Sequence, residues 1–260
     1  MREAVLITGA GSGIGRATAI RMAEEGKAVL LVGRRESALL ETLAAMKGEG
    51  HQVLPLDVAD RAAFHAALIQ AFGESDWSLS GVFANAGIGG ANAYSLDASE
   101  DLWEDILRIN VTGVYVTLQE ARPYLEAHVK RSGEVAHAVV TSSVLARFGV
   151  PQQSAYVTSK TAVLGLVRSL AVEWGAQGIL VNAICPGWVD TAMAQESIQR
   201  MADAQGMTYE ECHAQQCAVL PTGRMSTPEE MADTVAWMMS PAQRGMTGQG
   251  LDVNNGSWMS

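Results

Sequence analysis

The sequence predicts an α/β fold, a single three-layer domain built on a doubly wound parallel sheet. Apolar runs of roughly four to eight residues, typical of buried parallel strands, alternate with helical stretches along the whole chain. Polar and glycine-rich residues fall at the carboxyl ends of those runs, where such sheets bind ligands. Because no Pro/Gly/Ser-rich linker divides the 260 residues, we expect one domain over residues 1–260.

The first strand is expected at residues 3–8, an apolar run that ends in a glycine-rich turn at residues 9–15 before a helical stretch at residues 16–25. Glycines let the backbone approach a pyrophosphate closely, and the first turn of a helix offers unpaired N–H groups to an anion. Strand, turn and helix together therefore predict a phosphate-binding site. A tight turn without a ligand is the alternative.

The second strand, residues 28–32, ends at Gly33 and is followed by Arg34 and Arg35. A nucleotide site of this type usually places an acid here to hold the ribose 2′-hydroxyl of NAD, or an arginine to hold the 2′-phosphate of NADP. Since Gly33 leaves the acidic position empty, the two arginines favour NADP over NAD. Arginines that are simply solvated at a helix start are the alternative.

The middle of the chain continues the alternation. We expect helices at residues 37–47, 61–72 and 99–130, and strands at residues 52–56, 79–84 and 134–142. Asp57 follows a strand, where it can accept a hydrogen bond from an adenine amine or cap the next helix. Asn110 lies inside the long helix, an unfavourable place unless it faces solvent or has a function, and Pro123 is a candidate kink.

The last third of the chain adds a helix at residues 154–174 and strands at residues 178–185 and 249–253. Residues 192–223 are Met-, Gln- and Glu-rich helical pieces with little core periodicity. Because a long insertion after a strand end is more typical of a substrate lid than of a core, we expect a lid at about 190–223. Thr227 then opens the final helix with good capping chemistry.

The strongest chemical signal is the pair Tyr156 and Lys160, whose spacing of four places both side chains on one helix face. A cation about 4 Å from a phenol is worth roughly 4 kcal/mol at an effective dielectric of about 20. Lys160 is therefore expected to lower the pKa of Tyr156 and prepare it for proton transfer. Ser143, at a strand end upstream, can hydrogen-bond the same substrate oxygen. A surface helix with an accidental Tyr and Lys is the alternative.

Composition argues against several classes of protein. The formal net charge of −10 disfavours a nucleic-acid surface, which needs clustered Lys and Arg. Three cysteines, an odd count without metal-like spacing, and five unclustered histidines predict no metal site and favour a reducing compartment. No apolar run reaches the roughly 18 residues that span a membrane, and no export signal follows Met1, so we expect a cytoplasmic protein.

Together these motifs resemble the short-chain dehydrogenase/reductase family, in its single-domain branch of about 250 residues with a Rossmann-type fold. The resemblance covers essentially the whole chain and rests on the order and spacing of its parts. Ala146 stands where the family often has glycine, and Ser12 where many NADP-using members have a basic residue. The matching motifs are Thr8-Gly9-x-x-x-Gly13-x-Gly15, Asp57, Asn85-Ala86-Gly87, Asn110, Ser143, Tyr156-x-x-x-Lys160, and Pro186-Gly187 with Thr191.

The resemblance implies an oxidoreductase that transfers a hydride between NAD(P) and a carbonyl or secondary alcohol. Tyr156 would be the general acid/base, Lys160 would lower its pKa and hold the nicotinamide ribose, and Ser143 would orient the substrate oxygen. Asn110 would hold a water in a proton relay behind Lys160. The other residues implied to contact the cofactor are Gly9, Ser12, Gly13, Ile14, Gly15, Arg34, Arg35, Asp57, Val58, Asn85, Ala86, Gly87, Pro186, Gly187, Val189 and Thr191.

The residues expected around the substrate are mostly apolar, which predicts a ketone or secondary alcohol with an apolar body. Reduction of 3-oxoacyl thioesters is an alternative, as is a catalytically idle nucleotide-binding regulator; a methyltransferase would have no use for the Tyr/Lys pair. The expected lining is Val144, Leu145, Val150, Trp188, Val189 and Met193 beside Ser143 and Tyr156, with Met201, Met207 and Leu220 from the lid.

A homo-oligomer, most simply a tetramer, is also expected. The helix that holds Asn110 and the helix at residues 154–174 carry apolar residues on more than one side, and the resemblance suggests that they pair across a two-fold axis. The apolar residues in question are Val163, Leu164, Leu166, Val167 and Leu170.

Overall fold

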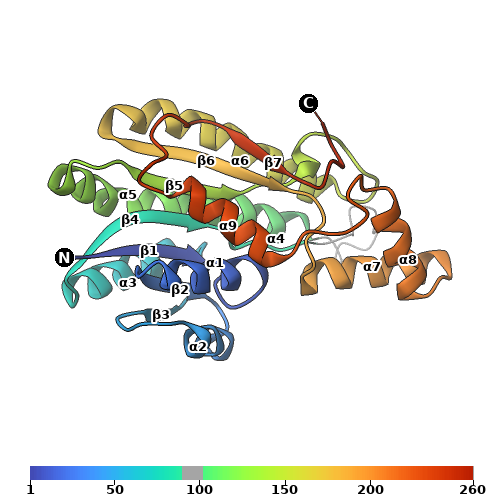
Figure 1. The fold of residues 1–260 in the computed structure, drawn as a ribbon, viewed down its shortest axis with the longest axis horizontal. Helices are drawn as coiled ribbons and strands as arrows, with labels where there is room; N and C mark the ends of the chain where they lie inside the picture. The colour runs from blue at the N-terminus through green and yellow to red at the C-terminus, as the bar shows by residue number, and fades with distance from the viewer. Residues whose placement is uncertain (90–101, 260) are drawn as a thin grey trace.

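The computed structural model describes residues 1–89 and 102–259, in which a seven-stranded parallel sheet lies between two layers of helices (Figure 1). The sheet order is β3-β2-β1-β4-β5-β6-β7. The strands from β1 to β3 are added toward one edge of the sheet, and the strands from β4 to β7 are added toward the other, so the order reverses where β1 and β4 lie side by side. The predicted doubly wound α/β fold is confirmed. The strands are β1 (Arg2–Thr8), β2 (Ala28–Gly33), β3 (Gln52–Pro55), β4 (Trp77–Ala84), β5 (Ala136–Thr141), β6 (Ile179–Pro186) and β7 (Gly250–Val253).

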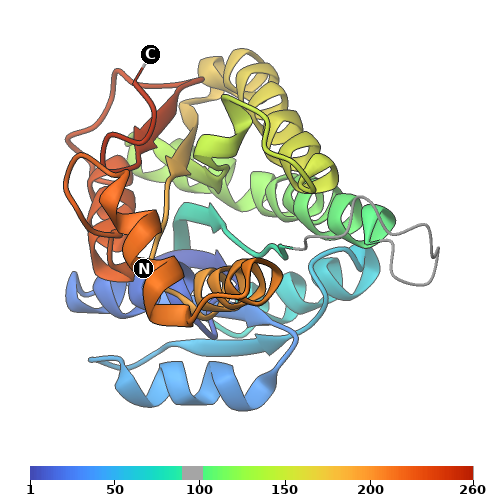
Figure 2. The same ribbon diagram turned by 90° about the vertical axis from the view of Figure 1, so that its right-hand side faces the viewer.

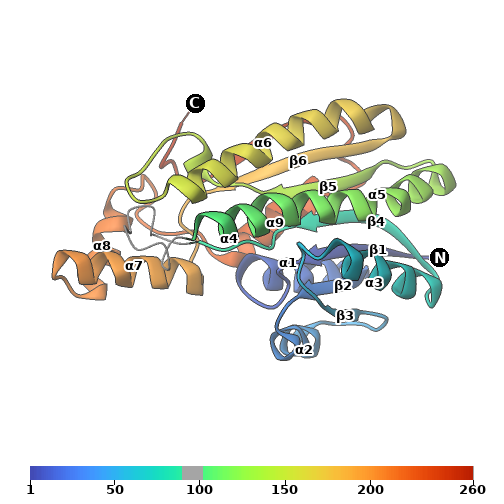
Figure 3. The ribbon, with the colours of Figure 1, turned by 180° about the vertical axis from the view of Figure 1, so that it is seen from behind.

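Helices cover both faces of the sheet. α1, α2 and α9 pack on the face that is in front in Figure 1, and α3, α5 and α6 pack on the opposite face, which is in front in Figure 3. The helices are α1 (Gly13–Glu24), α2 (Glu36–Ala45), α3 (Arg61–Gly73), α4 (Trp103–Leu107), α5 (Gly113–Ser132), α6 (Ser154–Trp174), α7 (Ala192–Gln205), α8 (Tyr209–Ala218) and α9 (Pro228–Met238).

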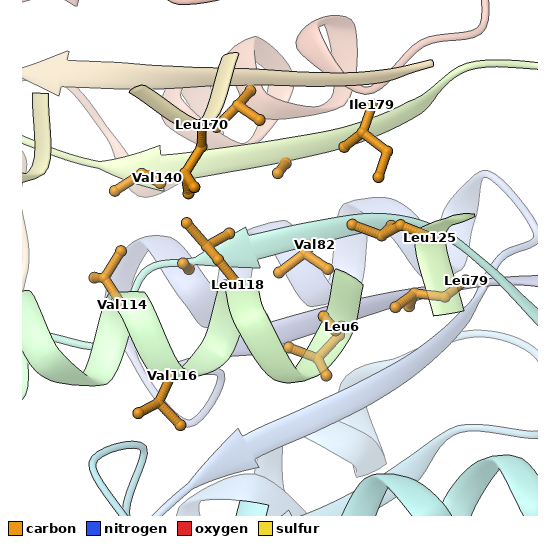
Figure 4. Packing of buried hydrophobic residues seen from close by; sticks show 14 of the residues in the cluster. Leu6, Leu79, Val82, Val114, Val116, Leu118, Leu125, Val140, Leu170 and Ile179 are labelled. Atoms are coloured by element: carbon orange, nitrogen blue, oxygen red, sulfur yellow. The ribbon is translucent and has the colours of Figure 1, made fainter. Parts of the chain in front are cut away.

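The larger hydrophobic core lies between the sheet and helices α3, α5 and α6. Figure 4 shows Leu6, Val82 and Val140 from three neighbouring strands opposite Leu118 of α5 and Leu170 of α6. All five side chains are buried. Burial of each such side chain is worth about 1.5–3 kcal/mol, so this packing fixes the strand ends that carry the polar residues.

The prediction of one continuous helix at residues 99–130 is wrong in its middle. Residues 99–101 lie outside the described part of the chain, and the rest forms α4, a π-helical turn (Arg108–Thr112) and α5. Pro123 lies inside α5, which continues to Ser132 and ends at Gly133 with a φ of 72°. A π-helical turn is often found at a functional site, and this one carries Asn110.

The helices α7 and α8 lie beyond the carboxyl ends of the strands. These strand ends face the viewer in Figure 2. Contrary to the expected lack of core periodicity, the two helices share a small hydrophobic cluster of their own with Ile198, Ala202, Cys212 and Met225. A capping box between Thr208 and the Glu211 carboxylate begins α8. This pair is therefore an ordered substructure.

The apolar residues of α6 do not form a free face. Val163, Leu164, Val167 and Leu170 are buried in the core of their own chain, and Leu166 packs against it. These five side chains therefore do not supply the expected pairing face, because the core of their own chain already covers them, and the pairing of the helix itself stays a prediction.

A polar cluster lies at the opposite, amino-terminal edge of the sheet. His137 of β5 is buried, and neither of its ring nitrogens has a hydrogen-bond partner in the described residues. Burial, helped by the nearby charges of Lys27 and His128, lowers the pKa of His137 to about 4. Burial lowers the pKa of His128 as well, although Glu3 opposes this.

We predict that the protein loses stability as the pH falls from about 6.5 to about 4. The unfolded chain takes up a proton on His137 in this window, and the folded chain does not, so the free energy of unfolding falls by about 3 kcal/mol. Urea unfolding at several pH values measures this slope. His137→Val should remove most of it, whereas His213→Gln on α8 should keep it; equal slopes for the wild type and His137→Val would contradict the prediction.

Candidate active site

The glycine-rich turn between β1 and α1 brings backbone very close to backbone. Gly9 and Gly13 have φ values of 68° and 51°, the left-handed region that favours glycine. A Cβ atom on Gly15 would lie 2.7 Å from Asn85 Nδ2 and closer still to the carbonyl oxygen of Gly9. Only glycine fits here, and the turn forms a cradle at the start of α1 that suits a pyrophosphate.

The ends of β1, β4 and β5 are held together by a hydrogen-bond network behind this turn. The Thr8 hydroxyl accepts from the backbone N–H groups of Asn85 and Ala86, each at 3.0 Å. The Asn85 side chain donates to the Thr8 carbonyl at 3.2 Å and accepts from the Thr141 hydroxyl at 3.0 Å. The network fixes the ends of β1, β4 and β5 relative to one another. The glycine turn follows β1, and the segment that carries Ser143 follows β5.

Asn110 is fully buried, and its amide connects three segments. Its Oδ1 accepts from the Ile88 N–H at 2.8 Å, and its Nδ2 donates to the Ile88 carbonyl at 2.9 Å and to the Ser159 hydroxyl at 3.1 Å. A Cβ atom on Gly87 would lie 3.1 Å from Asn110 Oδ1 and 3.5 Å from Lys160 Nζ. The π-helical turn is thus explained by a buried amide that positions the segment after β4 and the start of α6.

Tyr156 and Lys160 lie on one face of α6, as their spacing predicts. Lys160 is buried, its Nζ lies 5.6 Å from the centroid of the Tyr156 ring, and it donates to the Thr141 carbonyl at 2.8 Å. The Ser143 hydroxyl lies close enough to the Tyr156 phenol to lower its pKa. Ser142, the neighbouring hydroxyl, donates instead to the Lys160 carbonyl at 2.7 Å, so Ser143 is the serine that faces Tyr156.

The expected lowering of the Tyr156 pKa by Lys160 is not found in this structure. Burial raises the pKa of the phenol, and only the Ser143 hydroxyl opposes the rise. Burial also lowers the pKa of Lys160 to about 8, with a small opposing effect of Cys185. The reason is desolvation, which disfavours the charged form of each group more than their mutual attraction favours it.

The end of β3 differs from the expected adenine site in detail. Asp57 is engaged within the chain: it accepts from the Ala59 N–H at 2.9 Å and from Arg108 Nη1 at 2.9 Å. Burial raises its pKa, but these two hydrogen bonds and the charges of Arg108 and Arg34 outweigh this and hold the pKa below its usual value. Val58 is buried, and a Cβ atom on Gly113 would lie 2.6 Å from its side chain. The side chain of Val58 is therefore not available to a cofactor.

A cleft of about 1160 Å³ runs from the glycine turn past Tyr156 to α7 and α8. It does not include Gly15, Arg34, Arg35, Asp57, Val58 or Asn110, which stand outside or behind it, nor Met207 from the expected substrate set. The expected residues that do line it are Gly9, Ser12, Gly13, Ile14, Asn85, Ala86, Gly87, Ser143, Val144, Leu145, Val150, Tyr156, Lys160, Pro186, Gly187, Trp188, Val189, Thr191, Met193, Met201 and Leu220.

The outer part of the cleft is more polar than expected. Glutamines from three segments line it, namely Gln152, Gln153, Gln195, Gln205 and Gln216. Phe148 also lines it and stacks on Trp258, with ring centroids 5.5 Å apart. Neither feature follows from the sequence, because the glutamines are dispersed along it and the aromatic pair joins residues that are far apart.

Two negative findings apply to the described residues. No group of three or more His, Cys, Asp or Glu side chains in residues 1–89 and 102–259 could hold a metal ion. Within the same ranges, every helix is too short or too polar to cross a membrane. The three cysteines are free thiols.

Comparison with known proteins places this geometry in a family. The family model that matches residues 9–257 is described as enoyl-(acyl carrier protein) reductase. The 3-oxoacyl-acyl-carrier-protein reductase FabG of Staphylococcus aureus is 33% identical over 263 residues, which cover 100% of this chain and 99% of FabG.

Two solved structures show the same fold over nearly the whole chain. Levodione reductase has a TM-score of 0.85 and 32% identity, and the match covers 98% of this chain and 96% of that one. A variant of actinorhodin polyketide ketoreductase, solved with NADPH, has a TM-score of 0.86 and 32% identity over 98% of this chain and 97% of that one. With the family match over residues 9–257, these similarities show that the protein belongs to the short-chain dehydrogenase/reductase family.

Proposed function

We propose that this protein is an NAD(P)-dependent oxidoreductase that reduces the carbonyl group of an apolar ketone, or oxidises the corresponding secondary alcohol. One observation carries the proposal: the hydroxyls of Ser143 and Tyr156 meet at one point of a largely apolar cleft that begins at the glycine turn. Two convergent hydroxyls suit a single oxygen atom, such as that of a carbonyl, and the surrounding apolar walls suit a hydrophobic substrate body.

The glycine turn fits a dinucleotide because a Cβ atom on Gly15 would fill the cradle. Gly9, Gly13 and Gly15 would hold the pyrophosphate, and Pro186 and Gly187 would border the nicotinamide, which supplies or accepts the hydride. Tyr156 donates its phenolic proton to the substrate oxygen as the carbonyl carbon is reduced, and Ser143 orients and polarises that oxygen.

Lys160 and Asn110 support Tyr156 from behind. The Lys160 amine, held by the Thr141 carbonyl, stands beside the phenol and favours its anionic form when the proton leaves. We propose that Asn110 acts mainly by positioning, because its amide binds the Ile88 backbone and the Ser159 hydroxyl. This role extends the water-holding one implied by the family resemblance.

For the cofactor we propose NADP over NAD. Arg34 and Arg35 follow β2 and are exposed, Arg34 is close enough to Asp57 to affect its pKa, and no acid takes the place of Gly33. Similar structures were solved with either cofactor, the actinorhodin ketoreductase variant with NADPH and a 3-ketoacyl-acyl-carrier-protein reductase of Brucella melitensis with NADH, so the proposal rests on the two arginines.

A second candidate is the reduction of a 3-oxoacyl group carried as a thioester. FabG is named a 3-oxoacyl-acyl-carrier-protein reductase and the actinorhodin enzyme a polyketide ketoreductase, and the amide-rich outer cleft also favours such a substrate. Glutamine side chains can donate to and accept from the neutral amides of a pantetheine-like arm, while the apolar inner cleft takes the acyl chain.

Three further features complete the proposal. We propose that α7 and α8, within the expected segment at 190–223, act as a substrate lid, since they line the cleft and have their own small core. Exposed apolar side chains on α5, α6 and α9, namely Tyr115, Val172 and Trp237, support a homo-oligomer, most simply a tetramer. The free cysteines support a cytoplasmic location.

We predict that Tyr156→Phe abolishes turnover with little loss of cofactor affinity, because it removes only the transferable proton. Steady-state kinetics with NADPH and a ketone, and NADPH binding by fluorescence, measure the two quantities. Tyr115→Phe, an exposed tyrosine on α5, is the control. Since acid–base catalysis is worth about 10² to 10⁴-fold, retention of more than about a tenth of the wild-type kcat would refute the role of Tyr156.

We predict that NADPH is preferred over NADH and that Arg34→Asp reverses or erases the preference. The substitution replaces a phosphate partner with a repelling charge, so kcat/KM for NADPH should fall by about 10 to 100-fold, whereas kcat/KM for NADH should change little. Arg244→Asp, on a loop far from β2, controls for the change of net charge. Equal kcat/KM for both cofactors in the unmutated protein would count against the prediction.

We predict that apolar ketones, such as cyclic, aryl or acyl-chain compounds, exceed hexitols and sugar phosphates in kcat/KM. The reason is the apolar inner cleft around Ser143 and Tyr156. A higher kcat/KM for a hexitol or sugar phosphate than for every ketone tested would show this reading of the cleft to be wrong.

The same panel separates the two candidate substrates. If a thioester arm binds the outer cleft, Gln152→Ala and Gln216→Ala should raise KM for a 3-oxoacyl thioester and leave KM for a free ketone unchanged. If both KM values stay constant, the outer glutamines do not bind the substrate.

A further inference from the structure

The segment that carries Ser143 is long, and beyond Ser143 few of its hydrogen bonds reach the rest of the chain, although Phe148 stacks on Trp258 and Ala146 packs against the core. Residues 142–153 separate β5 from α6, and they contain a one-turn 3₁₀ helix (Val144–Ala146) and Gln152 with a φ of 62°, an uncommon value for a residue other than glycine. The backbone bonds of the turn are internal: Ala146 donates to the Ser143 carbonyl and Arg147 to that of Val144, each at 2.9 Å. Such a short helix does not hold its place alone.

Arg147 connects this turn to the sheet. Its Nε lies 3.2 Å from Asp252 Oδ1 and its Nη2 lies 3.3 Å from Asp252 Oδ2, a two-point contact between residues 105 apart in the sequence. Nη2 also donates to the Gly250 carbonyl at 2.9 Å and lies 3.8 Å from Cys185 Sγ. In the described chain, Arg147 is the only side chain from Val144 to Gln153 for which hydrogen bonds to other segments are found.

The contact is buried enough to be specific. The Arg147 and Asp252 side chains are only 26% and 23% exposed. A Cβ atom on Gly250 would lie 3.0 Å from Arg147 Nη2, so the guanidinium is closely packed against β7. A two-point contact between a guanidinium and a carboxylate fixes direction as well as distance, and a lysine cannot reproduce it.

Asp252 stands at a useful place for such a contact. It is the register partner of Cys185, which directly precedes Pro186 and Gly187 in β6. The Gly187 N–H in turn donates to the Val253 carbonyl at 3.1 Å. Arg147 therefore connects the Ser143 turn to the end of β7, which pairs with the end of β6, and these are the strand ends that would border the nicotinamide.

We propose that Arg147 is a positioning residue, and that its contact with Asp252 and Gly250 holds the Ser143 hydroxyl in register with Tyr156 and the nicotinamide side of the cleft. Arg147 does not line the cleft, so it acts through the Ser143 turn. The catalytic part of this proposal rests on the proposed function, and the ordering of the turn does not.

The test combines kinetics with hydrogen exchange. Arg147→Met should lower kcat by at least about 10-fold while the dissociation constant of NADPH stays within about twofold. The kcat values of Arg147→Lys and Asp252→Asn should lie between those of Arg147→Met and the wild type. These two variants keep the test valid if Arg147→Met folds poorly. In a Ser143→Ala background, Arg147→Met should lower kcat by no more than about threefold, because the group that it positions is already missing.

Hydrogen exchange measures the turn itself and needs no substrate. The amides of Leu145, Ala146 and Arg147 should exchange at least about 10-fold faster in Arg147→Met. The matched control is Arg21→Met, which breaks another Arg–Asp contact, 2.8 Å between α1 and Asp233 of α9, and should change neither kcat nor these amides.

Each outcome bears on one part of the account. Unchanged exchange in Arg147→Met overturns the proposal, whatever the enzyme reduces. Additive losses of kcat in the Ser143→Ala background overturn the action through Ser143. Faster exchange in a protein that reduces no ketone would support the ordering role of Arg147 and refute the proposed function instead.

Discussion

The site depends on the burial of one amine. Lys160 is 3% exposed, and its Nζ donates to the Thr141 carbonyl at the end of β5. Withdrawal from water lowers its pKa to about 8, so its charge is easily changed by a neighbouring group. Such an amine needs a closed surrounding, which is provided by the buried Asn110 amide and by Gly87, where a Cβ atom would crowd both. Gly87 and Asn110 thus form part of the closed surrounding of this lysine.

The parallel sheet brings the remaining groups to this amine. All strands end at one edge, and the reversal of strand order between β1 and β4 opens the crevice there. Thr8, Asn85 and Thr141 link three strand ends by hydrogen bonds, so the glycine turn and the Ser143 segment begin from a common frame. The hydrophobic core under the frame is rigid because its side chains are closely packed, which is how residues dispersed over the chain keep a common geometry.

The features that depend on local sequence patterns could be predicted from the sequence. The helix at residues 154–174 has the expected bounds, the strands differ by a few residues at their ends, and Ser143, Tyr156 and Lys160 meet as their spacing predicts. The features that depend on contacts between residues far apart in the sequence could not be predicted from it. The turn at Asn110 follows from hydrogen bonds to Ile88 and Ser159, and the pKa of Tyr156 follows from desolvation, which spacing does not report. The Asp57 contact with Arg108 and the Arg147 contact with Asp252 join segments that no motif links.

The most direct test of the account is to follow the hydride. The protein is incubated with an apolar ketone and NADPH that carries deuterium on one or the other face of nicotinamide C4, and NMR locates the label in any product alcohol. The account predicts one deuterium on the carbinol carbon from one of the two labelled cofactors, none from the other, and none from D₂O with unlabelled NADPH, because the proton from Tyr156 goes to oxygen. Carbinol deuterium that comes from D₂O would contradict it.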